Sequence, residues 1–223
     1  MYLQIRKYWY WPALAVDCYI KVPNCPQCAR NQIKLRRNVE QLQLFPATEQ
    51  LTSVCIDILG EFIKTPRRNE YLLFITDRFT KLTKTIPMKG ISAAEVGRCS
   101  VNEWVFNYGP LTELISDNGG CFTSKFFLDV FSILSIKNNF TATYHLQANG
   151  KVERYNPTIL AALRTYVADH PKDWDLYTDA LTYAYNCLPH TSTDVAPFDL
   201  VFYKPPGPLD LKLMPQGRNR KES

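Results

Sequence analysis

Three carboxylates constrain the fold of this chain more than any other feature of its sequence. They are Asp57 in LTSVCIDILG, Asp117 in LISDNGG and Glu153 in NGKVERYN, with 59 residues between the first two and 35 between the last two. Each acid lies at the edge of an apolar or helix-forming segment, so a rigid element could hold it in place. Three acids that converge repel one another unless cations neutralise them. The pattern therefore predicts a site for hard divalent metals, which take oxygen ligands, and two-metal phosphoryl transfer on a nucleic-acid backbone.

Taken singly, each acid has an ordinary structural explanation. An Asp before glycines is common in turns, and a Glu early in a helix interacts favourably with the helix dipole. The combination is more informative, because Asp57 interrupts an otherwise apolar strand, where an unpaired charge is costly. Asp117 precedes a glycine-rich turn, which allows close backbone approach. A bound metal would remove the cost of placing Asp57 in the strand.

Length and composition leave room for a folded enzyme and favour no membrane or secreted class. The chain of 223 residues fits one substantial domain with appendages, and its net charge of +5 mildly favours a polyanionic partner. Of seven cysteines only Cys25 and Cys28 show motif spacing. No disulfide framework is indicated, which favours a reducing intracellular compartment. No segment approaches the ~20 apolar residues of a membrane span, and no signal peptide is evident.

The order of segments indicates one compact domain with shorter parts on either side. We expect a short aromatic and basic module at 1–30, a polar linker at 31–50, the compact domain at 51–189 and a proline-rich basic extension at 190–223, which we expect to fray. Apolar runs predict strands at 51–60, 71–76, 82–88, 114–116 and 136–140. Helical spacing predicts helices at 92–107, 124–134, 150–169 and 174–187. Strands that come before and between helices favour a mixed α/β sandwich over a barrel.

One helix start carries a recognisable signal. Ser92 is followed three residues later by Glu95, which is the capping-box pattern. We expect the Ser92 side chain to accept a hydrogen bond from the third helical residue and the Glu95 side chain to reach back to Ser92.

The residues around the three acids resemble a known family. SDNGG-x-FTS-x-FF around Asp117, YHLQANGKVERYN around Glu153 and VCIDILG around Asp57 together resemble the catalytic core of retroviral and LTR-retrotransposon integrases, above all those of gypsy-type retroelements. The resemblance runs from about residue 8 to about residue 206. It implies an α/β, ribonuclease H-like three-layer fold with a central mixed five-stranded sheet, and two Mg²⁺ (or Mn²⁺) ions.

The resemblance also implies a reaction and the role of each acid. The family trims the 3′ ends of its DNA and then joins those ends to target DNA. Asp57 would bridge two ions, while Asp117 and Glu153 would each hold one. One ion then activates the attacking oxygen and the other stabilises the departing 3′-oxygen.

In the family, polar and basic residues beside the glutamate contact the DNA end. Here they are Tyr144, Gln147, Asn149, Lys151 and Arg154. A solvated helix face is the alternative explanation for this cluster. The resemblance further implies backbone-driven, salt-sensitive DNA binding, a homo-oligomer, no membrane, and residence in the nucleus.

The N-terminal module departs from the family pattern. The family binds zinc there through two histidines followed by two cysteines. Cys25 and Cys28 supply the cysteines, but no histidine precedes residue 145. A structural zinc needs four ligands, so we expect no stable zinc site within one chain.

Pro157 is a second departure, because it follows Glu153 by about one turn. A proline inside a helix kinks it, at a cost of ~3 kcal/mol. Alternatively the helix begins later, with Asn156 as N-cap and Pro157 at the first position, which would leave Glu153 on a loop. Leu146 stands where the family usually has proline, and little of the chain follows the core.

The sequence is compatible with two functions. The first is a polynucleotidyl transferase of the integrase type that uses all three acids. The alternative is a catalytically impaired or host-adopted integrase fragment that binds nucleic acid. A ribonuclease H-type nuclease acting on RNA–DNA hybrids shares the metal chemistry, but the flanking motifs argue against it.

Overall fold

A five-stranded mixed sheet organises this computed structural model, which describes residues 2–6, 8–21, 24–25, 49–140, 152–167 and 171–203. The strands are β1 (Ser53–Leu59), β2 (Tyr71–Asp77), β3 (Thr83–Met88), β4 (Glu113–Ser116) and β5 (Lys137–Phe140). Their spatial order is β3-β2-β1-β4-β5. β1, β2 and β3 pair antiparallel, whereas β4 pairs parallel with β1 and β5 parallel with β4.

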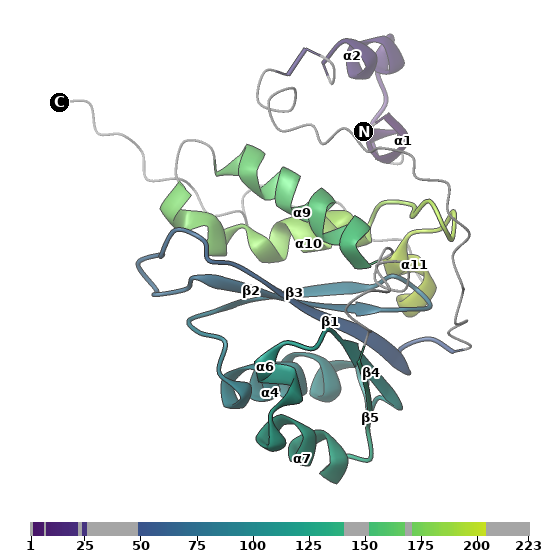
Figure 1. Cartoon of the computed structure of the whole chain (residues 1–223). Coiled ribbons are helices and arrows are strands. Elements are labelled where there is room, and N and C mark those ends of the chain that lie inside the picture. The colour runs from purple at the N-terminus through teal and green to yellow at the C-terminus, as the bar shows by residue number, and fades with distance from the viewer. Residues whose placement is uncertain are drawn as a thin grey trace, which may run out of the picture.

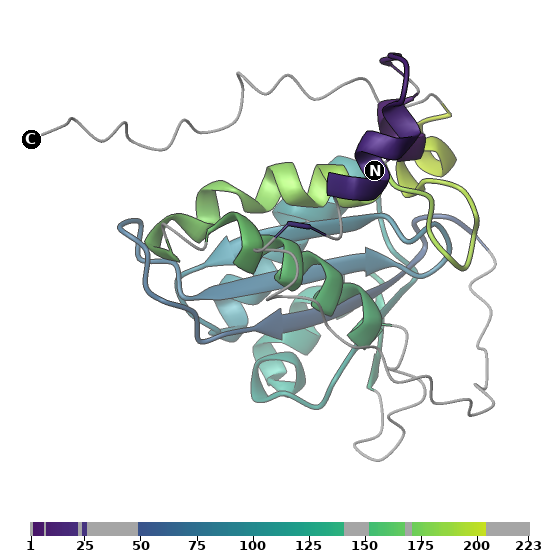
Figure 2. The ribbon, with the colours of Figure 1, turned by 90° about the horizontal axis from the view of Figure 1, so that it is seen from above.

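Helices cover both faces of the sheet and make the molecule three-layered (Figure 1). One face carries α9 (Val152–Tyr166), the short 3₁₀ segment η2 (Pro171–Leu176) and α10 (Thr178–Asn186). The other face carries α4 (Ala93–Ser100), the π-helical segment η1 (Val101–Val105), α5 (Phe106–Tyr108), α6 (Gly120–Thr123) and α7 (Lys125–Ile133). Figure 2, seen from above, shows α9 and α10 lying across the sheet.

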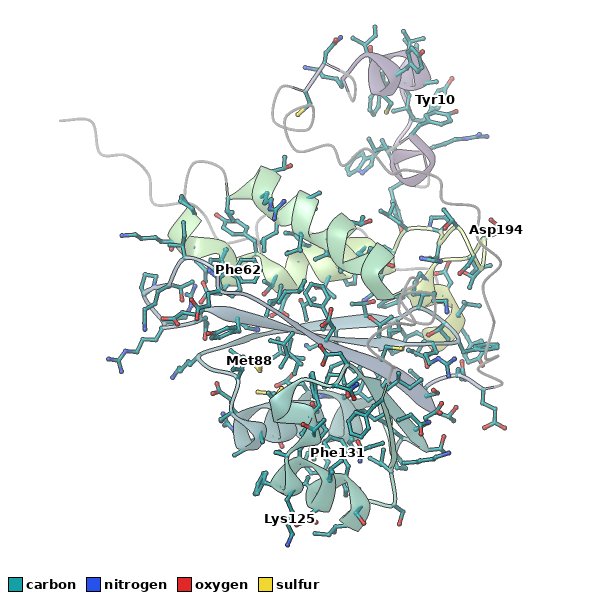
Figure 3. All side chains as sticks on the ribbon, viewed as in Figure 1. Tyr10, Phe62, Met88, Lys125, Phe131 and Asp194 are labelled. Atoms are coloured by element: carbon teal, nitrogen blue, oxygen red, sulfur yellow. The ribbon has the colours of Figure 1, made fainter. Side chains whose placement is uncertain are left out.

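The central strands are apolar because both of their faces are covered, as is usual for strands between two helical layers. On one face Ile56 of β1 belongs to the same buried cluster as Phe131 of α7. On the other face Phe74 of β2 is buried with Ile159 of α9. Figure 3 shows Phe62 and Phe131 on opposite sides of the sheet. Side chains alternate between the faces along each strand, so the apolar runs of the sequence fill two cores at once.

The start of α4 confirms half of the predicted capping box. Ser92 Oγ accepts a hydrogen bond from the Glu95 backbone N–H at 3.2 Å. The Glu95 carboxylate instead accepts from the backbone N–H of Lys89 at 3.1 Å. Glu95 therefore stabilises the loop before the helix, because an amide of that loop lies within its reach.

Helix boundaries differ from the sequence-based expectations at three places. The predicted helix at 92–107 is divided by the π-helical segment η1, and the last predicted helix begins as η2, with α10 starting only at Thr178. α9 begins at Val152 and includes Pro157 as its sixth residue. A later start at Asn156 is therefore wrong, and the backbone of Glu153 is helical.

Two polar clusters fasten the helices of the α9–α10 layer to the sheet. Asn186 of α10 bonds both backbone groups of Thr83 on β3: its Oδ1 accepts from the Thr83 N–H at 2.9 Å and its Nδ2 donates to the Thr83 carbonyl at 2.7 Å. Asp175 of η2 accepts hydrogen bonds from the connection between β1 and β2, namely from Thr65 Oγ1 at 3.0 Å, Arg67 Nε at 2.8 Å and Asn69 Nδ2 at 2.7 Å.

The terminal parts add short helices. α1 (Tyr2–Ile5) and α2 (Leu14–Lys21) lie in the N-terminal module. Beyond residue 189 the described chain continues into α11 (Pro197–Phe202), where Phe198 packs edge-on against Tyr183 with ring centroids 5.7 Å apart. The proposed domain limits stay predictions. Within the described residues no helix is both long and apolar enough to cross a membrane.

Candidate active site

Asp57 lies in the middle of the sheet on the face that α9 covers. It is the partner of Phe74 in the antiparallel β1–β2 ladder, and directly opposed residues project to the same face. Phe74 is buried together with Ile159 of α9, which fixes that face. The Asp57 side chain is half-buried, and its Oδ1 accepts a hydrogen bond from the Ile58 N–H at 2.9 Å.

Asp117 follows the last residue of β4 and is exposed. Its Oδ1 accepts a hydrogen bond from the backbone N–H of Gly119 at 2.9 Å, so the carboxylate folds back over its own turn. Burial raises the pKa of the nearby Cys121 thiol, and the negative charge of Asp117 adds to this increase.

The strand register brings Asp57 and Asp117 together. In the parallel β1–β4 ladder, Ser53 pairs with Glu113, Val54 with Leu114 and Cys55 with Ile115, so each pair differs by 60 in residue number. The ladder ends at Cys55–Ile115, so Asp57 and Asp117 each come two residues after the last pair on two adjacent parallel strands, and adjacent strands run roughly 5 Å apart. Both acids then lie on the α9 side, because Val54 and Leu114 share the opposite core.

Gly119 gives the Asp117 carboxylate its space. A Cβ atom built on Gly119 would lie 2.9 Å from Asp117 Oδ1, which is closer than such atoms approach in proteins. The backbone of Gly119 (φ −57°, ψ 142°) is open to any residue, so the constraint on this position is steric.

Glu153 belongs to the first turn of α9, the helix that packs on the face carrying Asp57. Its backbone is thus part of a helix anchored in the core by Ile159 and Leu163. The Glu153 side chain lies outside the described residues, as does that of Arg154. Tyr144, Gln147, Asn149 and Lys151 also lie outside them, so the predicted DNA contacts stay predictions.

The donor set fits a hard divalent cation. One carboxylate on β1 and one directly after β4 offer the oxygen ligands that Mg²⁺ and Mn²⁺ prefer, and their mutual repulsion favours a cation between them. Among the described side chains no group of three or more His, Cys, Asp or Glu residues is arranged to hold a metal. The third predicted ligand, Glu153, is not among those side chains. Cys25 of the incomplete zinc motif is half-buried, and Cys28 lies outside the described residues.

A polar cluster four residues before the acids along β1 and β4 was not predicted from the sequence. Glu113, four residues before Asp117, contacts Ser53 of β1, Arg78 and Asn139 of β5. The signal available in the sequence was a charged residue in a short apolar strand, on the same face as Asp117 because side chains alternate.

Sequence comparison finds transposon polyproteins. The chain is 29% identical over 149 residues to the retrovirus-related Pol polyprotein from transposon 412 of Drosophila melanogaster, which covers 67% of this chain and 12% of that protein. It is 27% identical over 205 residues to the transposon Tf2-3 polyprotein of Schizosaccharomyces pombe, covering 90% of this chain and 15% of that protein. The chain thus spans less than a sixth of the length of these relatives. No protein-family model matches it.

Structure comparison finds integrase catalytic cores. The HTLV-2 integrase catalytic core domain in complex with magnesium superposes with a TM-score of 0.58 at 18% identity, over 70% of this chain and 99% of that one. A chain of the simian T-cell lymphotropic virus intasome superposes with a TM-score of 0.64 at 17% identity, over 99% and 79% of the two chains. The ribonuclease H-like fold is confirmed, and so is the predicted resemblance to LTR-retrotransposon and retroviral integrase cores.

Proposed function

We propose that this chain is the catalytic core of an integrase of the LTR-retrotransposon type, a polynucleotidyl transferase that trims DNA 3′ ends and joins them to target DNA. One observation carries the proposal: β1, which holds Asp57 on the face that α9 covers, pairs in parallel with β4, which Asp117 follows directly. Glu153 is in the first turn of that helix. The transposon relatives and the integrase folds support the same reaction class.

The three acids have different environments, which suggests different tasks. Asp57 is half-buried on the central strand and is held at a fixed position in the ladder, so it suits the shared, bridging ligand. Asp117 is exposed at a strand end and is oriented by the Gly119 N–H, so it suits a ligand at the open side. Glu153 would complete the set from the helix. Bound divalent ions would supply Lewis-acid activation of the attacking oxygen and charge neutralisation at the phosphate.

DNA is the proposed partner, both as element end and as target. The net charge of +5 favours a polyanion, and binding through phosphates should weaken steeply with salt. Lys151 and Arg154 are the proposed contacts to the DNA end. Assembly into a homo-oligomer is proposed as well, since the HTLV-2 core was solved in trimeric and dimeric forms. A DNA substrate implies nuclear residence, which stays a prediction.

The test is a disintegration assay, in which the protein reverses the joining step on a branched DNA with Mg²⁺ or Mn²⁺. This reaction needs one competent active site and depends least on the terminal modules. Asp117→Asn should abolish cleavage and rejoining. The matched control is Asp129→Asn, the same chemical change at an exposed position of α7 on the opposite face of the sheet; it should retain wild-type activity.

The outcomes separate the proposal from its alternative. Activity that Asp117→Asn removes and Asp129→Asn spares would establish the transferase. A folded protein that binds DNA but is inactive with either metal would refute catalysis and favour the impaired or host-adopted fragment. Equal activity in both variants would indicate a contaminating nuclease and overturn the assignment of Asp117.

A further inference from the structure

β4 is a short inner strand of the sheet, and Asp117 follows it directly. It is four residues long and pairs with β1 through three residues and with β5 through four. A slip of one residue in a strand turns every side chain to the opposite face. Such a slip would move Asp117 away from Asp57 and bring Leu114 out of the core. The geometry of the acid pair therefore depends on what holds β4 in register.

The Glu113 side chain joins β4 to three other segments. Its Oε2 accepts a hydrogen bond from Ser53 Oγ of β1 at 2.6 Å and from Arg78 Nη1, just after β2, at 3.2 Å. Its Oε1 accepts from Asn139 Nδ2 of β5. Arg78 Nη1 also donates to Ser53 Oγ at 3.2 Å, so the cluster closes on itself.

The charged side chains of this cluster are partly shielded from solvent, so their hydrogen bonds can help to hold β4 in place. The side chain of Glu113 is 29% exposed and that of Arg78 19% exposed. Charge-assisted hydrogen bonds are the stronger class, and partly buried ones are screened less by salt than exposed ones. Ser53 is the ladder partner of Glu113 on β1, and Asn139 of β5 is the ladder partner of Ile115, two residues along β4. Residues two apart in a strand share a face, so Glu113 contacts both neighbouring strands on one face of the sheet.

We infer that Glu113 is a positioning residue that locks β4 in the register which sets Asp117 beside Asp57. The side chain of Glu113 acts four residues upstream of the acid and touches no reacting group. Backbone bonds also support β4 at this end, since the Thr112 N–H donates to the Thr52 carbonyl at 2.8 Å. The experiment must therefore separate the side-chain cluster from the ladder itself.

The inference rests on the proposed metal site, and Mn²⁺ titration of the full chain tests it. Glu113→Ala should raise the Mn²⁺ dissociation constant about tenfold, the low end for groups that orient metal ligands from outside. The isosteric Glu113→Gln keeps one acceptor oxygen and should fall between Glu113→Ala and wild type. The matched control is Thr85→Val, which removes a buried hydrogen bond of 2.5 Å to Thr182 and lies two strands away from Asp57, on β3. It should change the constant less than twofold.

A double-mutant cycle tests whether Glu113 acts through Asp117. In an Asp117→Asn background, adding Glu113→Ala should change Mn²⁺ binding no further. Equal Mn²⁺ affinity of Glu113→Ala and wild type would overturn the inference, and so would an additive effect in the cycle.

Hydrogen–deuterium exchange keeps this inference separate from the proposed function. Amides of residues 113–116 should exchange faster in Glu113→Ala than in wild type or Thr85→Val, whether or not metal binds. If wild type binds no Mn²⁺, or binds it equally well after Asp117→Asn, the proposed function fails. Hydrogen–deuterium exchange then still tests whether Glu113 holds β4 in register. If the β4 amides exchange equally fast in Glu113→Ala and in wild type, the inference that Glu113 holds the register is refuted.

Discussion

Replacing Gly119 with alanine should weaken the metal site without unfolding the protein. The added Cβ would lie 2.9 Å from Asp117 Oδ1, whereas ordinary contact begins at 3.4 Å, so the carboxylate must move by about 0.5 Å. Metal and catalytic constellations tolerate displacements of about that size at most. We expect Mn²⁺ affinity to fall about tenfold, which corresponds to ~1.4 kcal/mol. The backbone of Gly119 lies at φ −57° and suits alanine.

Gly120→Ala is the matched control for this prediction. A Cβ on Gly120 would meet no atom within 4 Å, and the residue is the first of α6. Isothermal titration with Mn²⁺ and thermal unfolding by circular dichroism should be run on both variants. The reasoning is refuted if Gly119→Ala binds Mn²⁺ as well as wild type, or if Gly120→Ala weakens binding equally.

Three further predictions concern stability. Asp175→Ala should destabilise the fold by ~2–4 kcal/mol in urea titrations, because it strands the donors of Thr65, Arg67 and Asn69; an unchanged midpoint would contradict this. Burial opposes ionisation of Asp175, but hydrogen bonds from Arg67, Asn69 and Thr65 prevail and hold its pKa below 3.8. The stabilisation is therefore present above pH 3.8 and lost as pH falls through the lower, folded-state pKa, so the acid unfolding of Asp175→Asn should lack this component. Asn186→Ala orphans both backbone groups of Thr83 and should cost ~2–3 kcal/mol, whereas Asn107→Ala, which removes an exposed bond to a carbonyl, should cost under ~0.5 kcal/mol. Pro157→Ala restores an amide donor inside α9, opposite the carbonyl of Glu153, and should stabilise by ~1–3 kcal/mol; lower stability on thermal unfolding would show that the proline is needed there.

β1 and β2 could be predicted because burial on both faces leaves near-continuous apolar runs, as in YLLFIT of β2. The N-cap at Ser92 could be predicted because the signal is local. The competing bond from Glu95 to Lys89 could not, since it depends on how the preceding loop folds. The start of α10 was misplaced because Trp174, apolar and helix-compatible, instead belongs to a 3₁₀ segment buried against the sheet.

The acid site, too, could be predicted only in part from the sequence. Motif and spacing identified Asp57, Asp117 and Glu153 as candidates, yet spacing along a chain does not fix which strands pair. That information lies in the β1–β4 register, a contact between residues 60 positions apart. The role of Glu113 could not be predicted for the same reason, because its partners Ser53 and Asn139 lie 60 and 26 residues away in the sequence.

The hydrogen bonds between Asn186 and Thr83 affect how this protein can associate with other molecules. β3 is an outer strand of the sheet, and the N–H and carbonyl of Thr83 that bond Asn186 point away from β2. Outer strands are templates onto which a strand from another molecule can add. Asn186 offers Thr83 the same donor and acceptor pair that an incoming backbone would bring. One amide side chain thus occupies a docking point for unwanted self-association, and its loss should promote aggregation as well as unfolding.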